Sequence, residues 1–66
     1  MNMIYLVLFE SVIDGSISVS QVAYKSNRSA KDFIQSHSLN PKEIYPGTFV
    51  DEEGNTYTVK WITVKE

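Results

Sequence analysis

The chain has 66 residues, a mass of 7.5 kDa, a formal net charge of −2 and no cysteine. A chain of this length forms one domain, residues 1–66, and buries only about 60% of the surface that it exposes when unfolded. Disulfides and structural zinc, which often supplement such small cores, are excluded because there is no cysteine and only one histidine, His37. The negative charge gives no general attraction to nucleic acid or to anionic lipid.

The longest apolar run, Met3–Phe9, is far shorter than the ~20 residues that span a bilayer, and no basic leader precedes it. We therefore expect a soluble, unprocessed protein that does not enter a membrane. The lack of cysteine fits a reducing compartment, and we predict a cytoplasmic location. No cofactor and no metal ion is expected, because the sequence has neither a glycine-rich phosphate loop nor a set of metal ligands at a recognised spacing.

The first half of the chain predicts a β-hairpin. Met3–Ile13 begins with bulky apolar and β-branched residues, which favour a buried strand. Asp14 and Gly15 supply the positive φ angles of a type I′ turn, and Ser16–Lys25 returns as the second strand. The apolar alternation shifts phase within this second strand, which indicates a β-bulge near Ser20.

An amphipathic helix is predicted after this hairpin. Ser29, with Asp32 three residues later, resembles a capping box, so the helix is expected to start there. Apolar side chains then recur at helical spacing over about two turns. They are Ala30, Phe33, Ile34 and His37. A second helix-start signal, Asn40 followed by Pro41, predicts one further helical turn.

The last part of the chain predicts a second hairpin. Its strands are Thr48–Asp51 and Asn55–Lys65, joined by the loop Glu52–Gly54 with the glycine in a left-handed conformation. Pairing of the strands across this loop would place Phe49 opposite Tyr57. The expected fold class is therefore α+β: a small four-stranded antiparallel sheet in the order β-β-α-β-β, with two hairpins and one short helix packed on one face.

The first strand is apolar on both faces of the predicted sheet. One face carries Ile4, Leu6 and Leu8, and the other carries Met3, Tyr5, Val7 and Phe9. A single short helix covers one sheet face only, so the sheet must curl into a partial barrel, pair with a second copy or dock on another protein. We expect the helix to cover the face of Phe49 and Tyr57. We interpret Tyr5, Val7 and Phe9 as contacts to a partner protein or to a second copy.

Two further groups are candidate partner contacts. Asp51, Glu52 and Glu53 form an acidic tip that can pair with arginines, and Trp61 adds an aromatic side chain. As an alternative, three aromatic side chains on one sheet face could stack the bases of single-stranded nucleic acid, with basic side chains contacting phosphates. The aromatic residues are Phe49, Tyr57 and Trp61, and the basic ones are Lys25, Arg28, Lys31 and Lys60.

Catalysis is not expected. His37 lies on the apolar stripe of the predicted helix, and no carboxylate or nucleophile stands at a recognised spacing from it. We therefore predict that the protein is not an enzyme and has no catalytic residues.

The order of elements, two strands, a serine-capped helix written NRSAKDFIQ and further strands, resembles the layout of many compact proteins encoded by phages and mobile elements. Some of those proteins inhibit host enzymes or defence systems by docking on them. The resemblance implies a non-catalytic protein-binding module that acts as a regulator or inhibitor, or that self-associates through a sheet face or edge. It carries no functional residue over to this chain.

Overall fold

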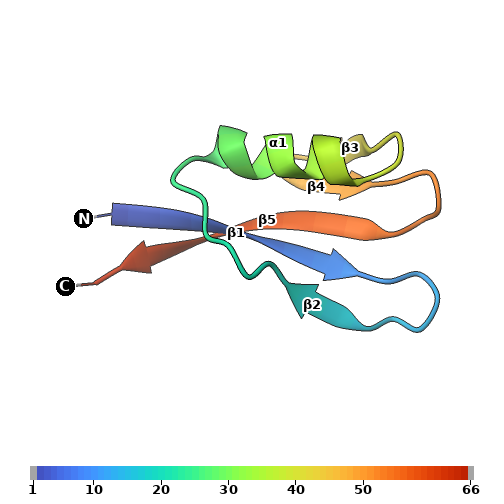
Figure 1. The fold of residues 1–66 in the computed structure, drawn as a ribbon, viewed down its shortest axis with the longest axis horizontal. Helices are drawn as coiled ribbons and strands as arrows, with labels where there is room; N and C mark the ends of the chain where they lie inside the picture. Colours follow the sequence, from blue (N-terminus) through green and yellow to red (C-terminus); the bar gives the residue numbers. More distant parts are fainter. Residues whose placement is uncertain (1, 66) are drawn as a thin grey trace.

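The computed structural model of the protein describes residues 2–65. Six elements follow one another in this range: β1 (Asn2–Glu10), β2 (Ile17–Val19), α1 (Asn27–His37), β3 (Lys42–Tyr45), β4 (Thr48–Val50) and β5 (Thr56–Val64). The strands form one antiparallel sheet in the order β2-β1-β5-β4-β3, and α1 packs on one of its faces (Figure 1). The predicted α+β class with one helix is confirmed, but the sheet has five strands and not four.

The additional strand is β3, which occupies the segment predicted as a helical turn. Asn40 has a φ angle of 48°, a left-handed conformation that interrupts a helix, and a proline such as Pro41 disfavours helical backbone at the residue before it. The chain therefore leaves α1 in an extended direction and pairs with β4, with a register shift between Glu43 and Tyr45. Gly47, with a φ angle of 82°, turns the chain from β3 into β4.

The first hairpin is confirmed, but both of its strands are shorter than predicted: β1 ends at Glu10, and β2 has three residues. The predicted type I′ turn is wrong, because Gly15 has a positive φ angle and Asp14 does not. The Ser11 N–H donates to the Ser16 carbonyl across the longer loop between them.

β2 ends at Val19, and the backbone N–H of Ser20 donates to the Val7 carbonyl at 2.8 Å. The Ser20 hydroxyl accepts a hydrogen bond from the Val7 N–H at 3.1 Å. A side-chain oxygen therefore occupies the place that a backbone carbonyl of β2 would take if the strand continued. The chain returns to β1 once more, at an isolated bridge between Tyr24 and Tyr5.

The helix starts two residues before the predicted position. Ser26 has an extended backbone and is the N-cap, because its hydroxyl accepts a hydrogen bond from the Ser29 N–H at 3.1 Å. The predicted capping box at Ser29 and Asp32 is therefore wrong. α1 ends after His37, where the N–H of Ser38 donates to the carbonyl of residue 34 at 3.0 Å.

The second hairpin has the predicted loop and register. The Asp51 N–H donates to the Asn55 carbonyl at 3.0 Å, and Phe49 pairs with Tyr57. Gly54 has a φ angle of 94°, the left-handed conformation expected for this loop. The core below α1 is built on this hairpin. Its buried members are Val7, Ala30, Ile34, Phe49, Tyr57 and Val59, with Tyr5, Phe9, Tyr24 and Phe33 packed against them.

The pairing of β1 with β5 corrects one prediction. Tyr5 lies opposite Trp61, Val7 opposite Val59 and Phe9 opposite Tyr57, and directly opposed residues share a sheet face. Consequently Tyr5, Val7 and Phe9 lie on the face that α1 covers, and Val7 is only 2% exposed. The prediction that these three form the uncovered side of β1 is wrong. The uncovered side is formed by the other alternating set, which contains Leu6.

Candidate protein-binding surface

The sheet face opposite α1, which we call the bare face, is largely aliphatic, with threonines on β4 and β5 and three charged residues. Strand alternation and the register of the sheet place eight aliphatic side chains on it. They are Ile4, Leu6, Leu8, Ile17, Val19, Val50, Ile62 and Val64. The helix of residues 2–65 packs on the other face, so the shielding that these side chains receive comes from their neighbours within the sheet. Ile62 is 48% exposed and Val19 is 51% exposed.

Two charged residues lie on the two central strands of the bare face. Lys60 of β5 stands opposite Leu6 of β1, and Glu10 lies four residues further along β1 on the same side. Leu8 lies between them. Within residues 2–65 the ion pair joins Lys31 Nζ to Glu43 Oε2 at 3.1 Å, so it includes neither of these two groups.

The end of the sheet that holds the chain termini narrows to two strands. β4 pairs with β5 only over Thr56–Thr58, and the Gly47 carbonyl accepts the N–H of Val59 at 2.8 Å. Beyond this point, the described chain places no strand beside Trp61–Val64 on that edge. Trp61, a predicted partner contact, is 64% exposed at this edge.

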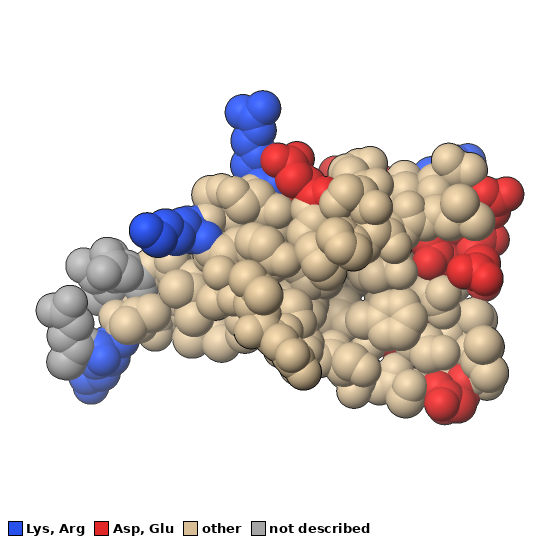
Figure 2. Space-filling view, in the orientation of Figure 1, with Lys and Arg blue, Asp and Glu red and all other residues tan. Residues whose placement is uncertain are grey.

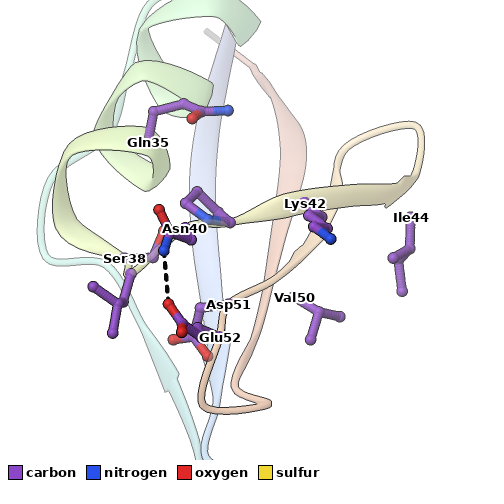
Figure 3. Close-up of a pocket in the computed structure, with 10 residues that line it drawn as sticks. Gln35, Ser38, Asn40, Lys42, Ile44, Val50, Asp51 and Glu52 are labelled. Carbon is purple, nitrogen blue, oxygen red and sulfur yellow. Dashed lines mark hydrogen bonds between the residues drawn. The ribbon is translucent and has the colours of Figure 1, made fainter.

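An open groove of about 1020 Å³ adjoins the bare face at β3 and β4 (Figure 3). It is lined by Gln35, Ser38, Leu39, Asn40, Pro41, Lys42, Ile44, Val50, Asp51 and Glu52. The Asn40 side-chain amide donates to Glu52 Oε2 at 2.7 Å, and the Glu52 N–H donates to the Leu39 carbonyl at 2.8 Å. These bonds hold the loop after α1 against the second hairpin. Because Val50 belongs to both surfaces, the groove extends the bare face laterally.

Asp51 of the predicted acidic tip has a structural role. The residue is only 7% exposed, and its carboxylate accepts hydrogen bonds from three residues. The N–H groups of Glu53 and Asn55 donate to Oδ1 at 3.0 and 2.8 Å, and the Tyr57 hydroxyl donates to Oδ2 at 3.3 Å. The Asn55 side-chain amide also donates to Oδ2, at 3.2 Å. Asp51 therefore organises the turn between β4 and β5.

Burial and hydrogen bonding act in opposite directions on this carboxylate. Burial, the largest single influence, raises the pKa of Asp51, but the bonds from Asn55, Glu53 and Tyr57 together lower it below 3.8. The pKa of Tyr57 is raised above 10.0, first by burial and then by the negative charge of Asp51. Both shifts keep the carboxylate charged and the phenol protonated near neutral pH. The pair therefore stays hydrogen-bonded there.

The remaining acidic side chains give the molecule a charged end. Glu52 and Glu53 are exposed on the β4–β5 turn, and Asp14 is exposed on the β1–β2 turn. Figure 2 shows most of the visible Asp and Glu atoms toward the end with the two hairpin turns, whereas most of the visible Lys and Arg atoms lie toward the other end. The acidic tip thus contains two exposed acidic residues, of which Glu52 accepts a hydrogen bond from Asn40, and one buried carboxylate that is bonded within the turn, that of Asp51.

The three aromatic residues predicted to stack nucleic-acid bases do not form a platform. Phe49 and Tyr57 are buried below α1, and only Trp61 is exposed. His37 stacks on Phe33, with 4.2 Å between ring centroids. Within residues 2–65, no three His, Asp or Glu side chains come together as a possible metal site. Nor does that part of the chain contain a helix long and apolar enough to cross a membrane.

Comparisons of the chain with protein-family models, with curated proteins and with solved structures give no match.

The bare face was anticipated as a feature but assigned to the wrong residues. The alternating set of Ile4, Leu6 and Leu8 was visible in the sequence, yet its side of the sheet depends on how β1 pairs with β5. The groove had no sequence signal, because it forms where the loop after α1 meets a hairpin that lies more than ten residues away in the chain.

Proposed function

We propose that the protein is a non-catalytic protein-binding module and that the bare face is its binding surface. The observation that carries this proposal is the set of eight aliphatic side chains on a sheet face that α1 does not cover. Contiguous exposed apolar surface of this kind is rare on monomeric proteins and marks interaction sites.

The energetics favour a partner over solvent. Complete burial of an aliphatic side chain contributes about 1.5–3 kcal/mol, and each half-shielded side chain of the bare face contributes a fraction of that. Summed over eight side chains, the free energy gained by burial is several times the ~1 kcal/mol effect of a typical single mutation. This gain opposes the free-energy cost of the rotational and translational freedom that is lost on binding.

The role that we infer is that of a small regulator or inhibitor which docks on another protein. The size, the order of elements and the apolar face support it. Such roles occur among the compact phage and mobile-element proteins whose layout the sequence resembles, and a cytoplasmic location fits the lack of cysteine.

Site-specific photocrosslinking tests the proposal. A photoreactive phenylalanine analogue at Ile62, on the bare face, is expected to crosslink to a protein in cells that express the chain. The same analogue at Asp32, exposed on α1, is the matched control and is expected to crosslink at background level. Equal crosslinking at both positions, or none at Ile62, contradicts the proposal.

A second candidate function, binding of single-stranded nucleic acid, is favoured by one observation. Trp61 is exposed and lines the same hollow as Lys31, so a base could stack on the indole while the Lys31 ammonium group contacts a phosphate. Titration of the fluorescence of Trp61, the sole tryptophan, with an oligonucleotide at low salt tests this candidate. Saturable quenching that weakens with added salt supports nucleic-acid binding, and an unchanged spectrum contradicts it.

A further inference from the structure

The two charges on β1 and β5 of the bare face are arranged so that a second copy can satisfy them, whereas the third charge of this face, Lys42, lies opposite Val50 on the edge strand β3. Lys60 and Glu10 have opposite signs, and the strand positions that they occupy differ by four residues, or roughly 14 Å. Leu8 lies midway.

A two-fold axis in the plane of the sheet-to-sheet interface, perpendicular to the strands at the level of Leu8, places each Lys60 over the partner's Thr56. The partner's Glu10 is the residue opposite that Thr56 on the next strand, about 4.8 Å to the side, so each Lys60 lies near the partner's Glu10.

We propose that the bare face packs on the bare face of a second copy, with the strands of the two copies running in opposite directions and two reciprocal ion pairs between Lys60 and Glu10. This inference rests on the proposed function, because it names the occupant of the same surface. Sheets packed face to face lie about 10 Å apart, which is within the combined reach of a lysine and a glutamate side chain.

The size of the face agrees with a weak, reversible dimer. β1 and β5 have nine residues each, or about 30 Å, and the other three strands are shorter. At about 4.8 Å per strand, the footprint is on the order of 450 Å² per copy, which gives roughly 900 Å² for two copies, slightly below the ~1,000 Å² typical of specific interfaces. Dimerisation is therefore expected to depend on protein concentration.

The charge distribution over the whole molecule supports the same orientation. Most of the visible acidic side chains lie toward the hairpin end, and most of the visible basic side chains lie toward the other end (Figure 2). Opposed strand directions place the acidic end of one copy over the basic end of the other. By contrast, pairing of two copies along the open edge Trp61–Val64 would bring Lys60 and Lys65 of both copies together. Like charges disfavour that arrangement.

Charge reversal with measurement of mass in solution tests the proposal. Sedimentation of the full chain from about 5 µM to about 500 µM is expected to show a monomer–dimer equilibrium. Lys60→Glu and Glu10→Lys are each expected to raise the dimer dissociation constant at least about tenfold, because each places like charges at two contacts. The double variant restores opposite charges and is expected to return the constant to near the wild-type value.

Lys25→Glu and Glu53→Lys are matched controls, because they make the same changes in net charge at exposed positions outside the bare face. They are expected to leave the dissociation constant within about twofold of wild type. Circular dichroism verifies that all variants are folded.

Three results overturn the inference: a monomer throughout the concentration range, single variants that dimerise like wild type, or a double variant without restoration. If the chain is monomeric while Ile62 still crosslinks to a different protein, this inference fails and the proposed function stands. If the chain dimerises but the variants of Lys60 and Glu10 have no effect, the copies meet through another surface, such as the Trp61–Val64 edge.

Discussion

At the scale of single residues, Asp51 shows how one carboxylate holds a turn. It accepts hydrogen bonds from two backbone N–H groups, from the Asn55 amide and from the Tyr57 hydroxyl. Asp51→Asn retains the shape but removes the charge and turns an amide toward donors. We expect this variant to lose about 1–3 kcal/mol of unfolding free energy at pH 7, measured by urea denaturation.

The pH dependence of this loss follows from the lowered pKa of Asp51. A carboxyl whose folded-state pKa lies below 3.8 stabilises the protein fully above its unfolded-state pKa and loses that contribution as the pH falls through the folded value. The stability difference between wild type and Asp51→Asn should therefore shrink below about pH 3.8. Glu53→Gln, at an exposed side chain of the same turn, is the control and should change stability by less than about 0.5 kcal/mol. A difference that grows on acidification contradicts the assigned role.

At the scale of elements, α1 depends on Ser26 for its start. Its hydroxyl satisfies the Ser29 N–H, one of the N–H groups that the first turn leaves without a helical partner. We expect Ser26→Ala to lower the unfolding free energy by about 1 kcal/mol, or the melting temperature by roughly 4–8 °C. Ser36→Ala is the control, because its hydroxyl bonds to the Asp32 carbonyl within the exposed part of the helix. A loss as large in that control would show a general effect of hydroxyl removal.

Elements whose signals are local were predictable. Gly54 and its flanking strands correctly predicted the loop and the register of the second hairpin. The spacing of Ala30, Phe33 and Ile34 correctly predicted the helix and the side of it that is buried. The segment from Asn40 was misassigned because the same residue pair that begins a helix also suits a left-handed turn into a strand. The local sequence does not distinguish these two outcomes.

Non-local pairing explains the error at the candidate site. β1 and β5 lie at opposite ends of the chain, and a shift of one residue in their register exchanges the two faces of a strand. Tyr5 and Leu6 are both apolar, so their sequence alternation does not identify the face toward α1. The excess of apolar strand surface was thus predictable, whereas the side chains that form it were not.

At the scale of the whole molecule, the two faces of one sheet are expected to contribute differently to stability, because α1 covers one face and leaves the other uncovered. The face below α1 contains Val59, which is 8% exposed, while the bare face contains Ile62 three residues later on the same strand. Val59→Thr should lower the unfolding free energy by about 1–3 kcal/mol, because it buries a hydroxyl in the core.

Ile62→Thr keeps a β-branched side chain at an exposed position and should change the stability of dilute protein by less than about 0.5 kcal/mol. A partner that binds only the folded chain makes the melting temperature depend on concentration. If the bare face meets a second copy, the melting temperature of wild type should rise with protein concentration, and that of Ile62→Thr should rise less. Scanning calorimetry over a hundredfold range of about 5–500 µM measures both slopes. Equal slopes for the two proteins would place Ile62 outside the interface, because removal of a buried aliphatic side chain must weaken the dimer to which it contributes.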